Sequence, residues 1–144
     1  MNPLAVSVGA VVCTILIHVA FATAIINLIR MEKRGGRVGK ALWFDIAIVG
    51  RAIALALVAH LIEMAVWAVL FVICGEFADF GTAYYHSAVN YTTLGYGDVL
   101  MSAKWRFLGP LEAANGMLLF GVTTAMVFAI MQHLVRARFE DLRD

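Results

Sequence analysis

The chain has 144 residues, of which 62% are hydrophobic and 15% are charged, and its formal net charge is +1 at pH 7. Soluble domains are about half apolar and a quarter charged, so this balance, with a mean hydropathy of +0.86, indicates a membrane protein. The near-neutral charge gives no reason to expect nucleic acid as a partner, and the length favours one domain.

Three apolar stretches are long enough to cross a bilayer, which takes about 20 residues of helix. The first gives an N-terminal transmembrane helix within residues 1–30; it is too long for a signal peptide and lacks the basic start of one. The second predicted span covers residues 46–74 and the third covers residues 109–134. The expected fold class is therefore an all-α integral membrane protein with three transmembrane helices.

Two basic segments set the expected orientation. Residues 31–45 form a basic loop, and residues 135–144 form a short tail with three arginines. The basic residues of the two segments and their borders are Arg30, Lys33, Arg34, Arg37, Lys40, Arg136, Arg138 and Arg143. Positive loops stay in the cytoplasm, which places the N-terminus and residues 75–106 outside and the C-terminus inside. Within residues 41–51, ALWFDIAIVGR either begins a long second helix or forms a short helix along the inner membrane surface.

Residues 80–92, FGTAYYHSAVNYT, are too short and too polar to cross a bilayer, and each of the two spans beside them needs its own ends on opposite faces. The chain must therefore dip into the membrane from outside and return. Irregular backbone at that depth is tolerated only where protein buries it or where it lines a water-filled path. A short re-entrant helix followed by an extended return through residues 93–98 meets this condition.

The sequence of residues 92–98, TTLGYGD, resembles the selectivity-filter signature of potassium channels. The order of outer helix (46–74), pore helix (80–92), filter (93–98) and inner helix (109–134) also resembles the pore domain of that superfamily, over residues 46–134. The N-terminal helix lies outside the resemblance. A filter ring needs four copies and the chain carries one, so we expect a homotetramer around a central pore.

The filter residues suit the binding of dehydrated K⁺ by backbone carbonyls. The carbonyls of Thr93, Leu94, Gly95, Tyr96 and Gly97 can form stacked rings, and the threonine hydroxyl adds the innermost ring. Successive carbonyls point the same way only if alternate residues take unusual backbone angles, which the two glycines allow. The expected cofactors are K⁺ ions in the filter, with no organic cofactor, and the leucine and tyrosine side chains should pack behind it.

The resemblance implies that Asp98 hydrogen-bonds a pore-helix aromatic residue behind the filter. Tyr85 is the expected partner and His86 the other candidate, whereas the position at which some relatives carry a glutamate is Val89. Filter bracing by fewer polar contacts is therefore expected. His86 either makes the filter respond to external pH, because histidine titrates near pH 6.5, or packs as a neutral ring between helices.

The third span carries the expected cavity and gate. Gly116 matches the hinge glycine implied by the resemblance, Gly121 should permit close packing, and Glu112 should lie at the helix N-terminus, where the helix dipole favours it. Five residues at three- and four-residue spacing form either a cavity-lining face or a plain packing stripe, and the last two are gate candidates. These residues are Met117, Phe120, Thr124, Phe128 and Met131.

Two ionisable residues, His60 and Glu63, lie three residues apart inside the second span, and His18 of the first span falls at a similar depth. Such groups are costly in a membrane and are usually paired. We expect a contact between His18 and Glu63 that docks the first helix on the channel core. Pairing within the second span or with the pore helix is the alternative.

The resemblance implies a potassium-selective channel that conducts passively across a cell inner (plasma) membrane. The alternatives are a non-conducting or regulatory pore subunit and a weakly selective cation channel. The sequence has no P-loop, HExxH, GxSxG or metal-spaced His/Cys set, so an enzyme is not expected. The expected partners are copies of the same chain and membrane lipids; no Arg ladder or ligand-binding domain indicates what opens the pore.

Overall fold

The computed structural model describes residues 2–140 and contains four helices in that range. They are α1 (Pro3–Arg34), α2 (Leu42–Ile73), α3 (Phe80–Tyr91) and α4 (Leu108–Glu140). Three of them, α1, α2 and α4, are long and apolar enough to cross a membrane, and residues 2–140 contain no strand. The predicted all-α fold class with three spans is thus confirmed. Arg143 and the end of the expected tail, residues 141–144, lie outside the described range.

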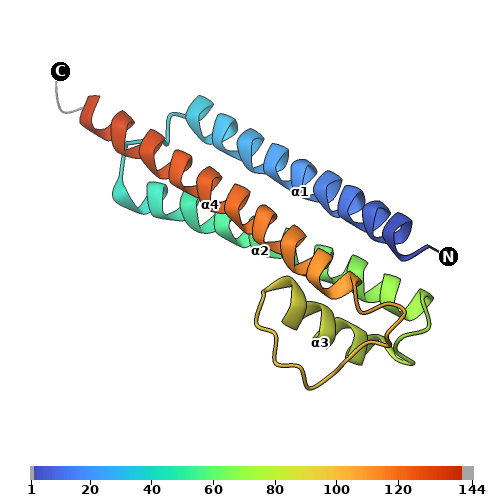
Figure 1. Ribbon diagram of the computed structural model, residues 1–144. Helices are drawn as coiled ribbons and strands as arrows, with labels where there is room; N and C mark the ends of the chain where they lie inside the picture. The colour runs from blue at the N-terminus through green and yellow to red at the C-terminus, as the bar shows by residue number, and fades with distance from the viewer. Residues whose placement is uncertain (1, 141–144) are drawn as a thin grey trace.

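The three long helices lie side by side and alternate in direction, while α3 and the loop after it gather where α2 ends and α4 begins (Figure 1). The choice left open for residues 41–51 is decided, because a single uninterrupted helix starts at Leu42. The last helix continues to Glu140, so that most of the segment expected as a tail is helical.

Side-chain caps fix where two of the helices begin. Asn2 accepts a hydrogen bond from the backbone N–H of Leu4 at 3.1 Å, and a proline follows it in the first turn of α1. At the start of α3, Asp79 Oδ1 accepts from the Thr82 N–H at 2.8 Å. That backbone hydrogen bond holds the pKa of the Asp79 carboxyl below its usual value. The short helix therefore begins at a defined residue although it has little more than three turns.

Ion pairs hold together the end of the bundle that carries the α1–α2 loop. Buried Glu32 of α1 lies 2.8 Å from Arg51 Nη2 of α2. Asp45 Oδ2 lies 2.6 Å from Arg138 Nη2 of α4, and its Oδ1 accepts from the Gly39 N–H at 3.1 Å. These contacts join α1 to α2, α2 to the end of α4, and the loop to α2.

Two apolar clusters form the core, one at each end of the bundle. The cluster near α3 includes Trp67, Phe71, Tyr91, Trp105 and Leu108. The cluster near the α1–α2 loop consists of Ile25, Ile48, Ala52, Ala56, Ile130 and Leu134. We compared the most apolar stretch of each long helix. The share of its residues that are buried is 44% in α2, 22% in α1 and 17% in α4. The second helix is therefore the centre of the chain, and the apolar faces of the other two are left for lipid or further copies.

The pore helix reaches well into the bundle. Tyr91, the last residue of α3, bonds Glu63, which lies about ten residues before the end of α2 at Ile73. At 1.5 Å per residue that is a depth of about 15 Å, half of a hydrocarbon core of about 30 Å. The helix enters from one face and stops near the middle, which is the re-entrant geometry expected for it.

Gly116 lies where α4 crosses the end of α3. A Cβ atom at this position would overlap the Tyr91 carbonyl oxygen and lie 3.0 Å from its carbonyl carbon, so only glycine fits. Close packing thus explains this glycine within the chain, while its role as a hinge stays a prediction. A Cβ at Gly121 would meet nothing within 4 Å, so the expectation of close packing there is wrong for contacts within the chain.

We predict that Gly116→Ala destabilises the protein and that Gly121→Ala does not. Overpacking costs about 1–3 kcal/mol, whereas alanine in an unobstructed helix gains up to about 1 kcal/mol over glycine. Thermal unfolding of the purified protein measures the difference, and equal shifts for the two variants would contradict the contact with Tyr91.

Candidate functional site

The backbone after α3 alternates in conformation along the expected filter. Residues Thr93, Gly95 and Gly97 have φ values of 61°, 63° and 72°, in the left-handed region. Thr93 is the only residue other than glycine with positive φ in the described part of the chain, although this region disfavours a side chain with a branched Cβ. The glycines behave as the sequence predicts, and the alternation extends two residues further back, to Thr93.

Three amide groups of this segment bond the end of the pore helix, while its carbonyls do not. The N–H of Thr93 donates to the Asn90 carbonyl at 2.8 Å, and those of Leu94 and Gly95 donate to the Val89 carbonyl at 2.9 and 3.2 Å. Within residues 2–140, none of the five carbonyls from 93 to 97 accepts a hydrogen bond. Five strong acceptors are therefore free to bind a ligand.

The bracing of the loop is as predicted for Tyr85, whose hydroxyl donates to Asp98 Oδ2 at 2.7 Å. This hydrogen bond is the main cause that holds the pKa of the Asp98 carboxyl below its usual value. His86 instead lies 3.0 Å from the Val99 carbonyl through Nδ1 and 2.8 Å from the Asn90 amide nitrogen through Nε2. The loop is thus held by two separate contacts from α3.

The surroundings of His86 match those of a packed neutral ring. The side chain is buried and lies against the rings of Phe71 and Phe77. Its Nδ1–H donates to a carbonyl, and its Nε2 accepts from an amide, which uses both nitrogens of the uncharged form. A response of the filter to external pH through His86 stays a prediction.

Glu112 does not have the role expected from its position in the sequence. The helix begins at Leu108, four residues earlier, and the carboxyl group is fully buried against the pore helix. The Ser87 hydroxyl lies 2.6 Å from its Oε1. The helix-terminal role is therefore wrong, and Glu112 connects the inner helix to the back of α3. An acidic residue two positions after a proline gave no signal of this burial.

The five expected cavity residues are all exposed within the single chain, so they share a face of α4 that no other part of the described chain covers. Phe120 also borders the core, with its ring centroid 4.2 Å from that of His60. The spacing thus gives a common outward face. Whether Met117, Thr124, Phe128 and Met131 line a pore stays a prediction.

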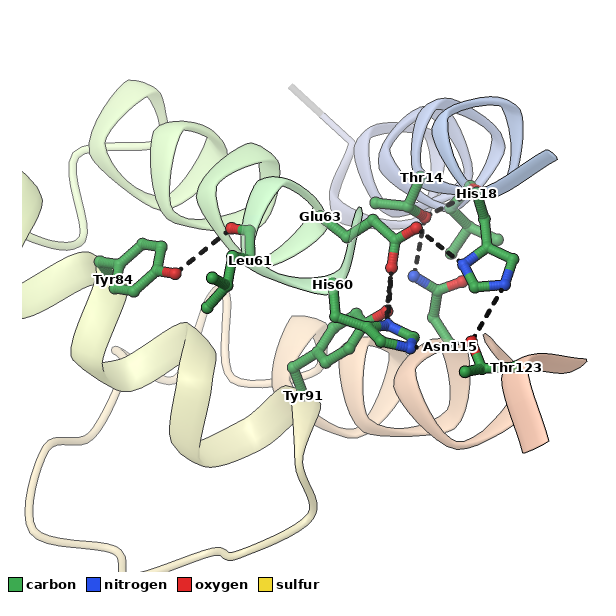
Figure 2. A network of polar contacts seen from close by, with 10 residues as sticks. Thr14, His18, His60, Leu61, Glu63, Tyr84, Tyr91, Asn115 and Thr123 are labelled. Atoms are coloured by element: carbon green, nitrogen blue, oxygen red, sulfur yellow. Dashed lines mark hydrogen bonds and ion pairs between the residues drawn. The ribbon is translucent and has the colours of Figure 1, made fainter. Parts of the chain in front are cut away.

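A buried polar cluster joins α1, α2 and α3 (Figure 2). His18 Nδ1 lies 3.0 Å from Glu63 Oε1, and His60 Nδ1 lies 3.0 Å from Glu63 Oε2. The Tyr91 hydroxyl donates to the same Oε2 and lies 3.1 Å from His60 Nδ1. The predicted contact between His18 and Glu63 is confirmed, and both alternatives, pairing within α2 and pairing with the pore helix, occur beside it.

The inner helix completes the cluster through residues that sequence reasoning missed. Thr123 Oγ1 lies 3.0 Å from His60 Nε2 and 3.4 Å from His18 Nε2. About two turns before Thr123 on the same helix, the Asn115 amide donates to Thr14 Oγ1 of α1 at 2.8 Å (Figure 2). Small polar residues are common in membrane helices, so only the fold identifies these as partners.

A model of an ion channel family matches residues 55–133, which is more than half of the chain. The chain belongs to this ion channel family. The match covers most of α2, all of α3 and most of α4, and it leaves out α1, which is thus an additional N-terminal helix. No curated protein and no solved structure matches the chain.

For the filter brace, we predict that Tyr85→Phe lowers the current at neutral external pH and makes it less sensitive to acid. In the wild type the brace is at full strength while Asp98 is ionised and is lost as the pH falls through the Asp98 pKa, which the Tyr85 hydrogen bond lowers. Without the Tyr85 hydroxyl there is no brace at any pH, so acid has no brace left to remove. Currents recorded across external pH measure both effects. Tyr84→Phe is the matched control, because the Tyr84 hydroxyl contacts the Leu61 carbonyl instead.

For the polar cluster, we predict that His18→Ala and Glu63→Gln each lower thermal stability and that their effects are not additive. Residues in one hydrogen-bond network show coupling energies of about 0.5–3 kcal/mol in double-mutant cycles. Unfolding of the two single variants and the double variant gives this coupling energy. Strict additivity would show that the contact does not hold α1 on the other helices.

Proposed function

We propose that the protein is a potassium-selective channel that conducts K⁺ passively through a homotetrameric pore with a TLGYG filter. The observation that carries the proposal is the row of five free carbonyls over residues 93–97, on a backbone with positive φ at every second residue. Rings of such carbonyls can replace the hydration shell of a potassium ion. The ion ligands would be the carbonyls of Thr93, Leu94, Gly95, Tyr96 and Gly97.

The orientation of α3 supports a cation at its end. The helix stops at Tyr91 near the middle of the bundle, with Thr92 as its C-cap. The C-terminus of a helix carries a partial negative charge, which would stabilise a K⁺ ion below the filter. The Thr93 hydroxyl would provide the innermost oxygen ring, and the face of α4 that carries Phe120 would line the cavity.

Surfaces left open on the single chain support assembly with further copies. Tyr96 is 66% exposed and Leu94 is 55% exposed, although both flank the filter. The apolar stretch of α4 is the least buried of the three spans. A tetramer would cover these side chains with neighbouring subunits and would close the carbonyl rings, which a single chain leaves open.

The proposed location is a cell inner (plasma) membrane, with the N-terminus outside and the C-terminus in the cytoplasm. The Glu32 and Asp45 ion pairs lie at the end of the bundle that carries the basic loop, and α3 with the filter lies at the opposite end (Figure 1). The positive-inside rule would place the first end in the cytoplasm. The filter would then open to the exterior, and conduction would follow the ion gradient without any chemical step.

In liposomes that contain the purified protein, we predict flux of K⁺ but not of Na⁺, and loss of K⁺ flux in Gly97→Ala. The substitution places a side chain at φ 72°, which costs about 1–2 kcal/mol and corresponds to roughly a tenfold loss of the conducting conformation. Gly75→Ala is the matched control. That glycine has φ 75° and equally open surroundings but lies outside the filter, so K⁺ flux should persist.

Each outcome of the flux measurement selects one function. Equal flux of K⁺ and Na⁺ would contradict the proposed selectivity and indicate a weakly selective cation channel. No flux of either ion would favour a non-conducting or regulatory subunit. Equal loss in the Gly97 and Gly75 variants would show that folding, rather than the filter, had been disturbed.

A further inference from the structure

Three buried side chains that the proposed ion path does not use converge on one point between the helices. His18, His60 and Glu63 are 3%, 3% and 0% exposed, and one ligand atom from each lies within 4.8 Å of the other two. The residues come from α1 and α2, 45 positions apart in the sequence for His18 and Glu63. Their spacing along the chain is not that of a metal motif, so only the fold reveals this set of donors.

The charge of Glu63 is not balanced by a permanent cation. Its ion-pair partners among residues 2–140 are the two histidines, and no Lys or Arg pairs with it there. A carboxylate near the middle of a membrane is costly unless positive charge offsets it. A bound divalent cation would supply this charge directly.

The hydrogen-bond count also favours a ligand between the two Nδ1 atoms. If both neutral rings donate Nδ1–H to Glu63, both Nε2 atoms must accept, yet they face the single hydroxyl proton of Thr123. If both Nδ1 atoms bind a metal, both Nε2–H groups donate to the two lone pairs of Thr123 Oγ1. Metal-bound histidines characteristically donate their other ring N–H in this way.

We propose that His18, His60 and Glu63 form a binding site for a divalent transition-metal ion, of which Zn²⁺ suits the donors best. Zinc takes His nitrogen at 2.0–2.1 Å and carboxylate oxygen at about the same distance in a tetrahedron, so its ligand atoms lie about 3.3 Å apart. His18 Nδ1 lies 3.0 Å from Glu63 Oε1, and His60 Nδ1 lies 3.0 Å from Glu63 Oε2. Both distances are close to this spacing. The Tyr91 hydroxyl, 3.1 Å from His60 Nδ1, is an oxygen that could take the fourth position.

The site is placed to join the additional helix to the pore. Two of its ligands are on α2 and one is on α1, while Tyr91 of α3 and Thr123 of α4 surround it (Figure 2). Phe120 packs on His60 at the exposed face of α4 and would separate the ion from the cavity. A bound ion would hold all four helices together at the depth where α3 ends.

The test is zinc binding by the full chain, purified in detergent, stripped with a chelator and then titrated with Zn²⁺ alone. We expect one ion per chain by elemental analysis and a higher melting temperature with zinc. His18→Gln should weaken binding by at least about 100-fold, because it removes a ligand. Thr123→Val should weaken it by about 10–100-fold, as the loss of an outer partner does.

The matched control is His133→Gln. His133 lies on α4 about ten residues beyond Thr123, so it is roughly 15 Å further along the helix, and it should not affect binding. Absence of zinc binding in the wild type, or equal binding in wild type and His18→Gln, would overturn the proposal and leave a hydrogen-bonded cluster around Glu63. Loss of binding in His133→Gln alone would overturn it as well.

A Co²⁺ titration of the wild type keeps the test independent of the folding of any variant. Cobalt in a tetrahedral site with nitrogen and oxygen ligands absorbs strongly in the visible range, whereas six-coordinate cobalt on a protein surface absorbs weakly. A strong band that Zn²⁺ removes supports the buried site. A weak octahedral spectrum would count against it.

Discussion

The attachment of Tyr91 to the long helices determines where the rest of the pore loop lies. As the last residue of α3, it donates its hydroxyl proton to Glu63 of α2, and its carbonyl packs directly against Gly116 of α4. Backbone that leaves a helix inside a membrane is tolerated only where protein buries it or water reaches it. Tyr91 is buried by protein at the point where the helix stops, so the segment that follows can be irregular.

The conformation of residues 93–97 follows from this attachment. Their first three N–H groups wrap back onto the carbonyls of Val89 and Asn90, so the segment continues the end of α3 instead of forming a separate loop. The left-handed conformation of Thr93 costs about 1–2 kcal/mol, which these hydrogen bonds can offset. These three amide groups are hydrogen-bonded, whereas none of the five carbonyls accepts a hydrogen bond within residues 2–140. That asymmetry leaves free acceptors along a short stretch of backbone, as the proposed filter requires.

Patterns local in the sequence predicted the spans, the pore helix and the backbone conformation at two residues of the proposed filter, because each depends on its own residues. The apolar runs gave three helices, and the two glycines indicated positive φ at residues 95 and 97. Contacts between distant segments were harder to predict. The partnership of His18 with Glu63 followed from depth alone, since a straight helix rises evenly. Burial of Glu112 against Ser87 depends on how α4 rotates, which neither periodicity nor composition fixes.

The additional helix is part of the core and not an appendage to it. Thr14 and Ile25 of α1 are fully buried and His18 is nearly so, against helices that belong largely to the matched family region. Without α1, the carboxyl group of Glu63 would lose one of its three hydrogen-bond donors and would face lipid, where an ionised group is costly. The polar pair His60 and Glu63 on α2 is thus compatible with a membrane only because α1 covers it. The Glu63 carboxylate therefore needs α1 to cover it, and the same carboxylate anchors the pore helix through Tyr91.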